Sequence, residues 1–208
     1  MIVRMSAGME ITMKQTDIIN PFQPYMTLEM DGYSQINRTD YGISHFYEFT
    51  IHDEKKHCIK AVPDASIDLL FNIGENKVST YISGTVFGVK KWELGTQDDC
   101  FGVRFQPGQG ILPKDITMEM IVNDDIEIDG DIFGKNLTEK IALAKTMSER
   151  IEIFKKAYED MVLGRNSLSD KEKINEYLVN RIGRTKGMIT MRQLEDETNY
   201  SACYLRRI

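Results

Sequence analysis

The chain has 208 residues, of which 41% are hydrophobic and 28% charged, and its net charge is −6. This composition is typical of a globular protein, and no repeat or low-complexity segment occurs. No apolar run approaches the ~20 residues of a membrane span, and residues 1–13 lack the pattern of a secretory signal. The three cysteines have neither metal-ligand nor redox-motif spacing, so we expect reduced thiols in a cytoplasmic protein.

The charge is distributed unevenly along the chain. Residues 1–163 carry 17 basic and 26 acidic side chains, a net charge of −9, whereas residues 164–208 carry 9 basic and 6 acidic side chains, a net charge of +3. Neutralisation of phosphates requires Lys and Arg. Any contact with nucleic acid is therefore expected from the basic tail and not from the acidic body.

From Tyr25 to about Gln106 the pattern predicts only β-strands. Short runs of apolar and β-branched residues alternate with turn signals such as Pro63-Asp64 and Pro107-Gly108. The expected strands are 43–51, 58–62, 67–73, 78–87, 90–94 and 100–105. Short strands at this spacing predict a sandwich or a small barrel.

After Gly110 the pattern changes. A short helical turn is expected at 112–115, and the acidic segment 121–128 returns as an edge strand or a loop. From Leu137 onward the pattern is helical, and Gly164 ends the expected helix. Three- and four-residue steps give that helix one apolar stripe. The stripe consists of Ile151, Phe154, Tyr158, Met161 and Val162.

Two capping boxes mark the helices that follow. Ser169 with Glu172 opens a helix that we expect to stop at Gly183. Thr190 with Gln193 opens the next one by the same mechanism, in which hydroxyl and carboxylate or amide satisfy free backbone amides.

The segment 187–208 reads as two short helices around a tight turn. Asn199 tolerates the left-handed conformation that such a turn requires, and Ser201 caps the second helix. This is the layout of a helix-turn-helix, whose second helix enters the DNA major groove.

This segment resembles the first helix-turn-helix of AraC-type bacterial transcription regulators. The residues that carry the resemblance are Leu194, Tyr200, Ser201, Leu205 and Arg207. Glu195 departs from the usual alanine at the crossing of the two helices, and Asn199 replaces the usual glycine. The chain stops at Ile208, inside the expected recognition helix and before the family's second helix-turn-helix. We expect the natural chain to continue and the full-length form alone to bind promoter DNA well.

Two stretches of the β region resemble the "PDG…DL-F" and "FGVRF-PG" signatures of the sensor domain in many AraC-type regulators. They are residues 62–71 and 101–108, with Ala65-Ser66 in place of the usual Gly-small pair. The resemblance implies an α+β protein: a cupin-like β-barrel or sandwich followed by helices and ending in a partial helix-turn-helix.

Together these patterns divide the chain into four parts. We expect an N-terminal arm at 1–24, a cupin-like sensor domain at 25–136, a helical dimerisation or linker region at 137–164 and a truncated DNA-binding domain at 168–208.

Five side chains are candidates for a ligand pocket in the β domain: His45, Tyr47, Asn72, Trp92 and Arg104. Tyr47, Asn72 and Trp92 could equally belong to the core. Arg104 could bind an anionic ligand through bidentate hydrogen bonds, or it could be structural and pair with Asp68. The recurrence of its surrounding signature among sensors favours the structural role.

A metal-dependent cupin enzyme is an alternative that the histidines raise. Such a site needs two or three imidazoles and a carboxylate around one ion. His45 and Glu48 are three positions apart and so face opposite sides of a strand, while His52 and His57 flank a charged loop. We therefore expect no metal site, no cofactor and no enzymatic activity.

The helical stripe has two possible roles. The AraC-type resemblance implies that helices in this position often pair subunits, which makes Ile151, Phe154, Tyr158 and Met161 candidates for a homodimer interface. The stripe could equally pack against the outside of the β domain.

The resemblance also assigns the DNA-binding role. Its candidates are Ser201, Cys203, Arg206 and Arg207, among which arginine pairs with the O6 and N7 atoms of guanine or contacts phosphate. The leading hypothesis is a sensor that couples an unidentified small-molecule effector in the β domain to sequence-specific DNA binding. The alternatives are the metal-dependent enzyme and a ligand-free dimerisation module.

Overall fold

The computed structural model describes residues 21–50, 58–75, 77–93, 99–110, 112–164 and 169–207. The chain divides into two compact units. We call residues 20–165 the sheet unit and residues 166–208 the helical unit, and each is described by itself. The expected arm at 1–24 falls almost entirely outside the described residues.

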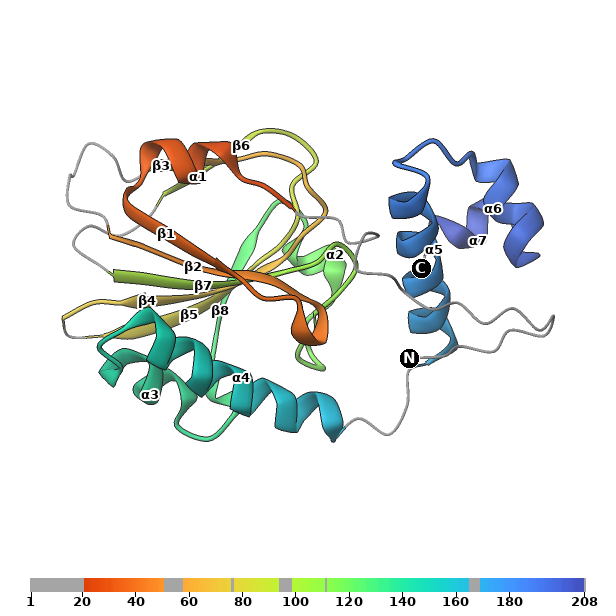
Figure 1. Ribbon diagram of the computed structural model, residues 1–208. Helices are drawn as coiled ribbons and strands as arrows, with labels where there is room; N and C mark the ends of the chain where they lie inside the picture. Colours follow the sequence, from red (N-terminus) through yellow and green to blue (C-terminus); the bar gives the residue numbers. More distant parts are fainter. Residues whose placement is uncertain are drawn as a thin grey trace. The chain divides into compact units, whose positions relative to one another are not determined.

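An antiparallel six-stranded sheet forms the centre of the sheet unit (Figure 1). In spatial order its strands are β1 (Asp31–Asn37), β2 (Ile43–Thr50), β7 (Asp99–Phe105), β4 (Asp68–Ile73), β5 (Val78–Ser83) and β8 (Asp125–Ile128). Two strands outside it, β3 (Cys58–Ala61) and β6 (Lys90–Glu93), pair with each other. The six-stranded sheet is open, with β1 and β8 at its edges, so the α+β class is confirmed but the sheet does not close into the expected barrel.

The sheet has a different covering on each face (Figure 1). One face is covered by the helices α3 (Leu137–Leu143) and α4 (Met147–Leu163). The other face lies beneath α1 (Pro24–Glu29) and the β3–β6 pair, which we call the roof. Three shorter helical segments complete the unit: η2 (Asp40–Gly42), α2 (Met118–Ile121) and η4 (Gly130–Phe133).

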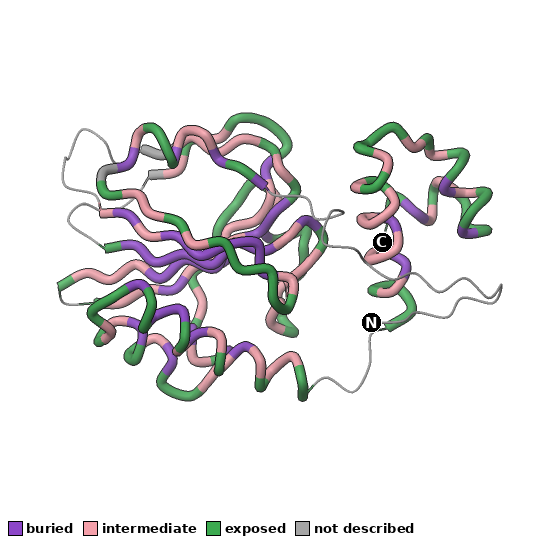
Figure 2. Tube along the Cα trace, viewed as in Figure 1, coloured by how far each residue is buried: buried purple, intermediate pink, exposed green. Residues whose placement is uncertain are grey.

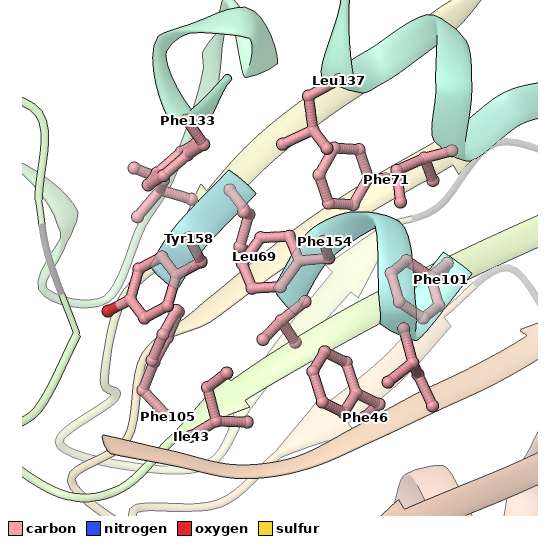
Figure 3. Close-up of a cluster of buried hydrophobic side chains, with 14 of the residues drawn as sticks. Ile43, Phe46, Leu69, Phe71, Phe101, Phe105, Phe133, Leu137, Phe154 and Tyr158 are labelled. Atoms are coloured by element: carbon pink, nitrogen blue, oxygen red, sulfur yellow. The ribbon is translucent and has the colours of Figure 1, made fainter. Parts of the chain in front are cut away.

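The main hydrophobic core lies between the sheet and α3–α4 (Figure 3). Phe154 and Tyr158 of α4 are less than 2% exposed and pack on aromatic rings of the strands. In Figure 2 the buried residues concentrate in the central strands. Thr146 and Glu149 form a capping box that starts α4, and Gly164 caps its end as expected. The stripe thus packs on the sheet of its own chain.

Strand register assigns every second side chain to the roofed face. Three cross-strand rows lie there: His45, Arg104 and Asp68; Tyr47, Gly102 and Leu70; Phe49, Cys100 and Asn72. The intervening residues, such as Phe46, Val103 and Leu69, face the helices. His45, Tyr47 and Phe49 therefore share one face of the sheet.

Several expected boundaries differ in the structure. Pro24–Glu29 is helical where only strands were expected. The strand expected to reach Phe87 ends at Ser83. Gly84 follows at a close approach to the Ile121 backbone, where an added Cβ would sit 1.9 Å from the Ile121 carbonyl oxygen. The acidic segment does return as an edge strand, β8.

The helical unit contains α5 (Asp170–Arg184), α6 (Met191–Thr198) and α7 (Ala202–Leu205). Both expected capping boxes are present at the starts of α5 and α6. The expectation that α5 stops at Gly183 is wrong, because the left-handed turn that reverses the chain comes later, at Lys186 and Gly187. A small core of Ile174, Leu178, Leu194 and Leu205 holds the three helices together.

Candidate ligand cavity and helix-turn-helix

A cavity of about 210 Å³ lies between the roofed face of the sheet and the roof. The sheet contributes side chains from β2, β4, β5, β7 and β8, and the roof contributes Met26, Ala61 and Trp92. Its lining is mixed: aromatic and aliphatic groups surround four charged side chains. The charged residues are Asp64, Asp68, Arg104 and Asp125.

Arg104 is the centre of a buried ion-pair network on the cavity wall. Its side chain is 5% exposed, and its two terminal nitrogens donate to Asp68 Oδ2 at 2.7 Å and to Asp64 Oδ2 at 2.5 Å. Asp68 stands opposite Arg104 in the register of β4 and β7. The sequence-based alternative that Arg104 pairs with Asp68 is therefore confirmed, and the same side chain also lines the cavity.

Asp64 reaches this network from a turn and not from a strand. Gln23 Nε2 donates to Asp64 Oδ2 at 2.9 Å, and the backbone amide of Ser66 donates to Asp64 Oδ1 at 3.2 Å. Ala65 between them has a φ of 59°, in the left-handed region that glycine usually occupies. This is the position at which the AraC-type signature has glycine.

Three buried polar atoms of cavity-lining residues have no hydrogen-bond partner among the described residues. They are Ser66 Oγ, Asp68 Oδ1 and Arg104 Nε. Buried polar groups are normally paired, and one left unpaired costs about 1–3 kcal/mol. The ion pairs of Arg104 with Asp64 and Asp68 are thus formed, whereas these three polar atoms remain without a partner among the described residues.

Burial changes the protonation behaviour of this face. It raises the pKa of Asp68 to about 6, although the adjacent Arg104 charge acts in the opposite direction. Burial and the Arg104 charge lower the pKa of His45 to about 4. Burial, reinforced by the Asp68 charge, raises the pKa of Tyr47 well above its usual 10.0.

Gly102 determines how Tyr47 lies on the cavity wall. The two residues are register partners on β2 and β7, and a Cβ at 102 would be 2.0 Å from the Tyr47 ring. The ring therefore lies across the bare backbone of Gly102. The rings of Tyr33 and Phe49 each stack with the Tyr47 ring at a centroid distance of 6.2 Å.

Of the five predicted pocket residues, the structure brings four to the cavity: Tyr47, Asn72, Trp92 and Arg104. His45 does not line it; its ring is 5% exposed and its Nδ1 lies 3.1 Å from Ser44 Oγ. Sequence reasoning missed Asp64 and Gln23, although Asp64 lies within the quoted "PDG" signature.

The structure separates the residues considered for a metal site. Glu48 faces α4, where Arg150 lies 3.6 Å away, whereas His45 faces the roofed side. His52 and His57 lie outside the described residues. No group of three or more His, Cys, Asp or Glu within the described ranges could hold a metal ion.

The helical unit contains the expected turn. Asn199 has a φ of 58°, and Ser201 Oγ accepts from the Tyr204 amide at the start of α7. Glu195, the departure from the family pattern, has a local role: its Oε1 accepts from the Ala202 amide at 2.6 Å. This carboxylate therefore caps α7 from α6, where alanine could not.

The four candidate DNA-binding residues are all exposed in the helical unit. Cys203 lies on α7, and Arg206 and Arg207 follow directly after it. Ser201 is also exposed, although its hydroxyl serves as the α7 cap.

Glu197 connects α5 to α6 by accepting from Tyr177 Oη at 2.8 Å and from Arg181 Nε at 2.7 Å.

The candidate dimer residues are mostly covered within the chain. Ile151, Phe154 and Tyr158 are 0–2% exposed in the main core, and only Met161 is partly exposed at its edge. These three side chains are not available to a partner subunit.

A family model described as a domain of unknown function (DUF6597) matches residues 41–127. The match runs from η2 into β8 and includes the whole cavity lining except Gln23 and Met26. No curated protein and no solved structure matches the chain. Within the described residues, no helix is both long and apolar enough to cross a membrane.

Proposed function

We propose that this chain is a ligand-responsive transcription regulator of the AraC type. The sheet unit binds a small molecule in the cavity, and the helical unit contacts promoter DNA. The roofed sheet takes the place of the cupin-like barrel that the resemblance implies.

The observation that carries the sensing role is the cavity with its unsatisfied polar atoms. Ligand sites are concave, mainly apolar and equipped with a few convergent polar groups. The space above Tyr47 and Leu70, bordered by the Arg104 network, has these properties. It favours ligand binding over a ligand-free dimerisation module.

The DNA-binding role is supported by geometry and charge in the helical unit. A helix, a left-handed turn at Asn199 and a second short helix follow in the order of a helix-turn-helix. Arg206 and Arg207 are exposed immediately after α7. Arginine at this place can contact guanine edges or phosphates.

Coupling between the units completes the proposal. A ligand changes DNA affinity only if it binds one arrangement of the chain better than another. The proposal therefore requires a measurable difference in DNA affinity between the free and the ligand-saturated chain.

The test begins with selection of duplexes from a randomised pool by the 208-residue chain at low salt. Anisotropy of a selected duplex then gives the affinity as salt rises from about 50 to about 200 mM, where phosphate contacts predict a steep loss. Arg206→Ala and Arg207→Ala are expected to weaken binding by about 1–3 kcal/mol for a base contact, or to reduce the salt slope by about one for a phosphate contact.

Arg38→Ala is the matched control, because it removes the same charge from an exposed position of the sheet unit. It should leave DNA affinity unchanged. Equal binding of the selected duplex by the Arg206, Arg207 and Arg38 variants would contradict the DNA-binding role.

A further inference from the structure

The charge around the cavity is unfavourable for an anionic ligand. Three carboxylates and one guanidinium line it. The terminal nitrogens of Arg104 already donate to Asp64 and Asp68, so its positive charge is neutralised within the wall. Lys90, outside the lining, lies over the Trp92 ring, donates to the Asn123 carbonyl and pairs with Asp124 at 3.6 Å. The cavity thus has an excess of negative charge.

The unsatisfied atoms indicate what a ligand must offer. Ser66 is 2% exposed and its Oγ has no partner among the described residues. Asp68 Oδ1 has no partner with hydrogen-bond geometry there either, although the Tyr47 hydroxyl interacts with the same carboxyl group. Both line the cavity. A carboxylate oxygen only accepts hydrogen bonds, so Asp68 requires a donor, and a cationic N–H donor gives the strongest bond.

The remaining lining sets the size and the apolar part of the ligand. Phe49, Leu70, Tyr81 and Trp92 supply aromatic and aliphatic surface. A volume of about 210 Å³ is below the ~300–1,000 Å³ of sites that hold drug-sized ligands. The occupant is therefore small, with room for one ring or a short chain.

We propose that the cavity binds a small primary amine in its ammonium form. The ammonium group donates to Asp68 Oδ1 and Ser66 Oγ, and the attached ring or chain packs against Leu70, Tyr81 and Trp92. This ligand class deepens the sensing role proposed above and rests on it.

The groups that face Asp68 imply a pH dependence. They are Arg104 on β7, Asp64 in the turn, Tyr47 on β2, Tyr33 on β1 and, across Arg104, His45. Since the pKa of Asp68 is about 6, its carboxyl is mostly ionised at pH 7.5 and mostly protonated at pH 5. Amine binding is therefore expected to be weaker at pH 5.

Three probes of one size and three charges test the proposal: benzylamine, benzyl alcohol and benzoate. Titration of the 208-residue chain at about pH 7.5, followed by calorimetry and by fluorescence of Trp92, the only tryptophan, gives each affinity. We expect benzylamine to bind at least about tenfold more tightly than benzoate, with benzyl alcohol between them.

Two variants locate the amine. Asp68→Asn should reduce benzylamine affinity by about tenfold or more and change benzyl alcohol affinity by less than about threefold. Ser66→Ala, which changes no charge, should reduce benzylamine affinity by a smaller factor and remains informative if Asp68→Asn does not fold. Asp115→Asn is the control, because Asp115 is exposed and does not line the cavity.

Three outcomes would overturn the ligand class: benzoate binding as tightly as benzylamine, no binding of any probe up to about 10 mM, or Asp68→Asn binding benzylamine like Asp115→Asn. Tighter binding of benzoate would refute the amine while leaving a sensing cavity in place. Benzylamine binding through Asp68 with no change in DNA affinity would support the amine and refute the coupling.

Discussion

At the scale of single residues, the contact between Gly102 and Tyr47 shapes the cavity wall. We expect Gly102→Ala to lower the free energy of unfolding by about 2–3 kcal/mol, because the added Cβ would overlap the Tyr47 ring at 2.0 Å. Urea unfolding followed by Trp92 fluorescence measures the change.

Gly88→Ala is the matched control for that substitution, since a Cβ at Gly88 meets nothing within 4 Å. Its effect should stay within about 0.5 kcal/mol. The cost of Gly102→Ala should also shrink when Tyr47 is replaced by Leu, because the two residues are in contact. Equal costs in both backgrounds would show that the overlap is relieved elsewhere.

His45 makes the second prediction at this scale. Its pKa is about 4 in the folded chain and about 6.5 when unfolded, so between these values the unfolded state binds the extra proton and stability falls as pH falls. From pH 7 to pH 5 this loss is on the order of 2 kcal/mol.

Asp68 acts in the opposite direction, because its raised pKa makes the folded state the better proton acceptor between about pH 4 and 6. Asp68 is present both in the original chain and in the His45→Asn variant. Its contribution to the pH dependence therefore cancels when the unfolding free energies of the two chains are compared. Relative to the original chain, the variant should gain about 2 kcal/mol between pH 7 and pH 5 in urea unfolding. A constant difference across this range would contradict the lowered pKa.

At the scale of elements, α4 is expected to act through the core of its own chain. Phe154 is 0% exposed and contacts the rings of Phe46, Phe71 and Tyr158. Phe154→Ala should cost about 3–5 kcal/mol of unfolding free energy. The cost should not depend on protein concentration, whereas loss of a dimer contact would.

Glu152→Ala provides the control on the same helix, because Glu152 is exposed. It should change stability by about 0.5 kcal/mol or less. A concentration-dependent loss confined to Phe154→Ala would instead assign this helix to an interface.

The elements also show what the sequence could predict. Strands β2, β4 and β7 follow from period-two alternation, which is a local property. Helix α1 could not be predicted in the same way, because it has no capping hydrogen bond from a side chain and buries only Met26. A sheet closes into a barrel only if its two edge strands pair with each other. Here the edge strands are β1 and β8, and no local sequence pattern determines whether they pair.

The candidate site divides along the same line. Tyr47, Asn72 and Arg104 lie on strands, where parity places each side chain on a definite face. Asp64 reaches Arg104 from the turn at Ala65, which has a left-handed backbone conformation. Because alanine rarely adopts that conformation, the sequence does not predict it. Strand alternation correctly places His45 on the roofed face. It does not predict how far the cavity extends over that face, and His45 lies outside the cavity lining.

At the scale of the whole molecule, the two units have cores of very different size. Within 169–207, the described part of the helical unit, four apolar residues are buried, including Leu194, whereas the sheet unit has the large core of Figure 3. Leu194→Ala should cost the helical unit about 2–4 kcal/mol and reduce its helix content, because Leu194 is one of the few buried side chains that hold α5, α6 and α7 together.

Circular dichroism reports the helices, and Trp92 fluorescence reports the sheet unit alone. We expect Leu194→Ala to abolish DNA binding and leave the Trp92 transition and cavity binding unchanged. Met188→Ala, at an 82% exposed position of the same unit, should alter neither signal. A shift of the Trp92 midpoint by Leu194→Ala would show that the units unfold together.

The alternation of the central strands has a consequence for divergence among related sequences. On β4, Leu69 and Phe71 contact the helices, while Asp68, Leu70 and Asn72 line the cavity. Because neighbouring positions serve opposite faces, substitutions at one set leave the other set in place. Substitutions at Asp68, Leu70 and Asn72 can therefore alter the cavity lining while Leu69 and Phe71 preserve the core of the same strand.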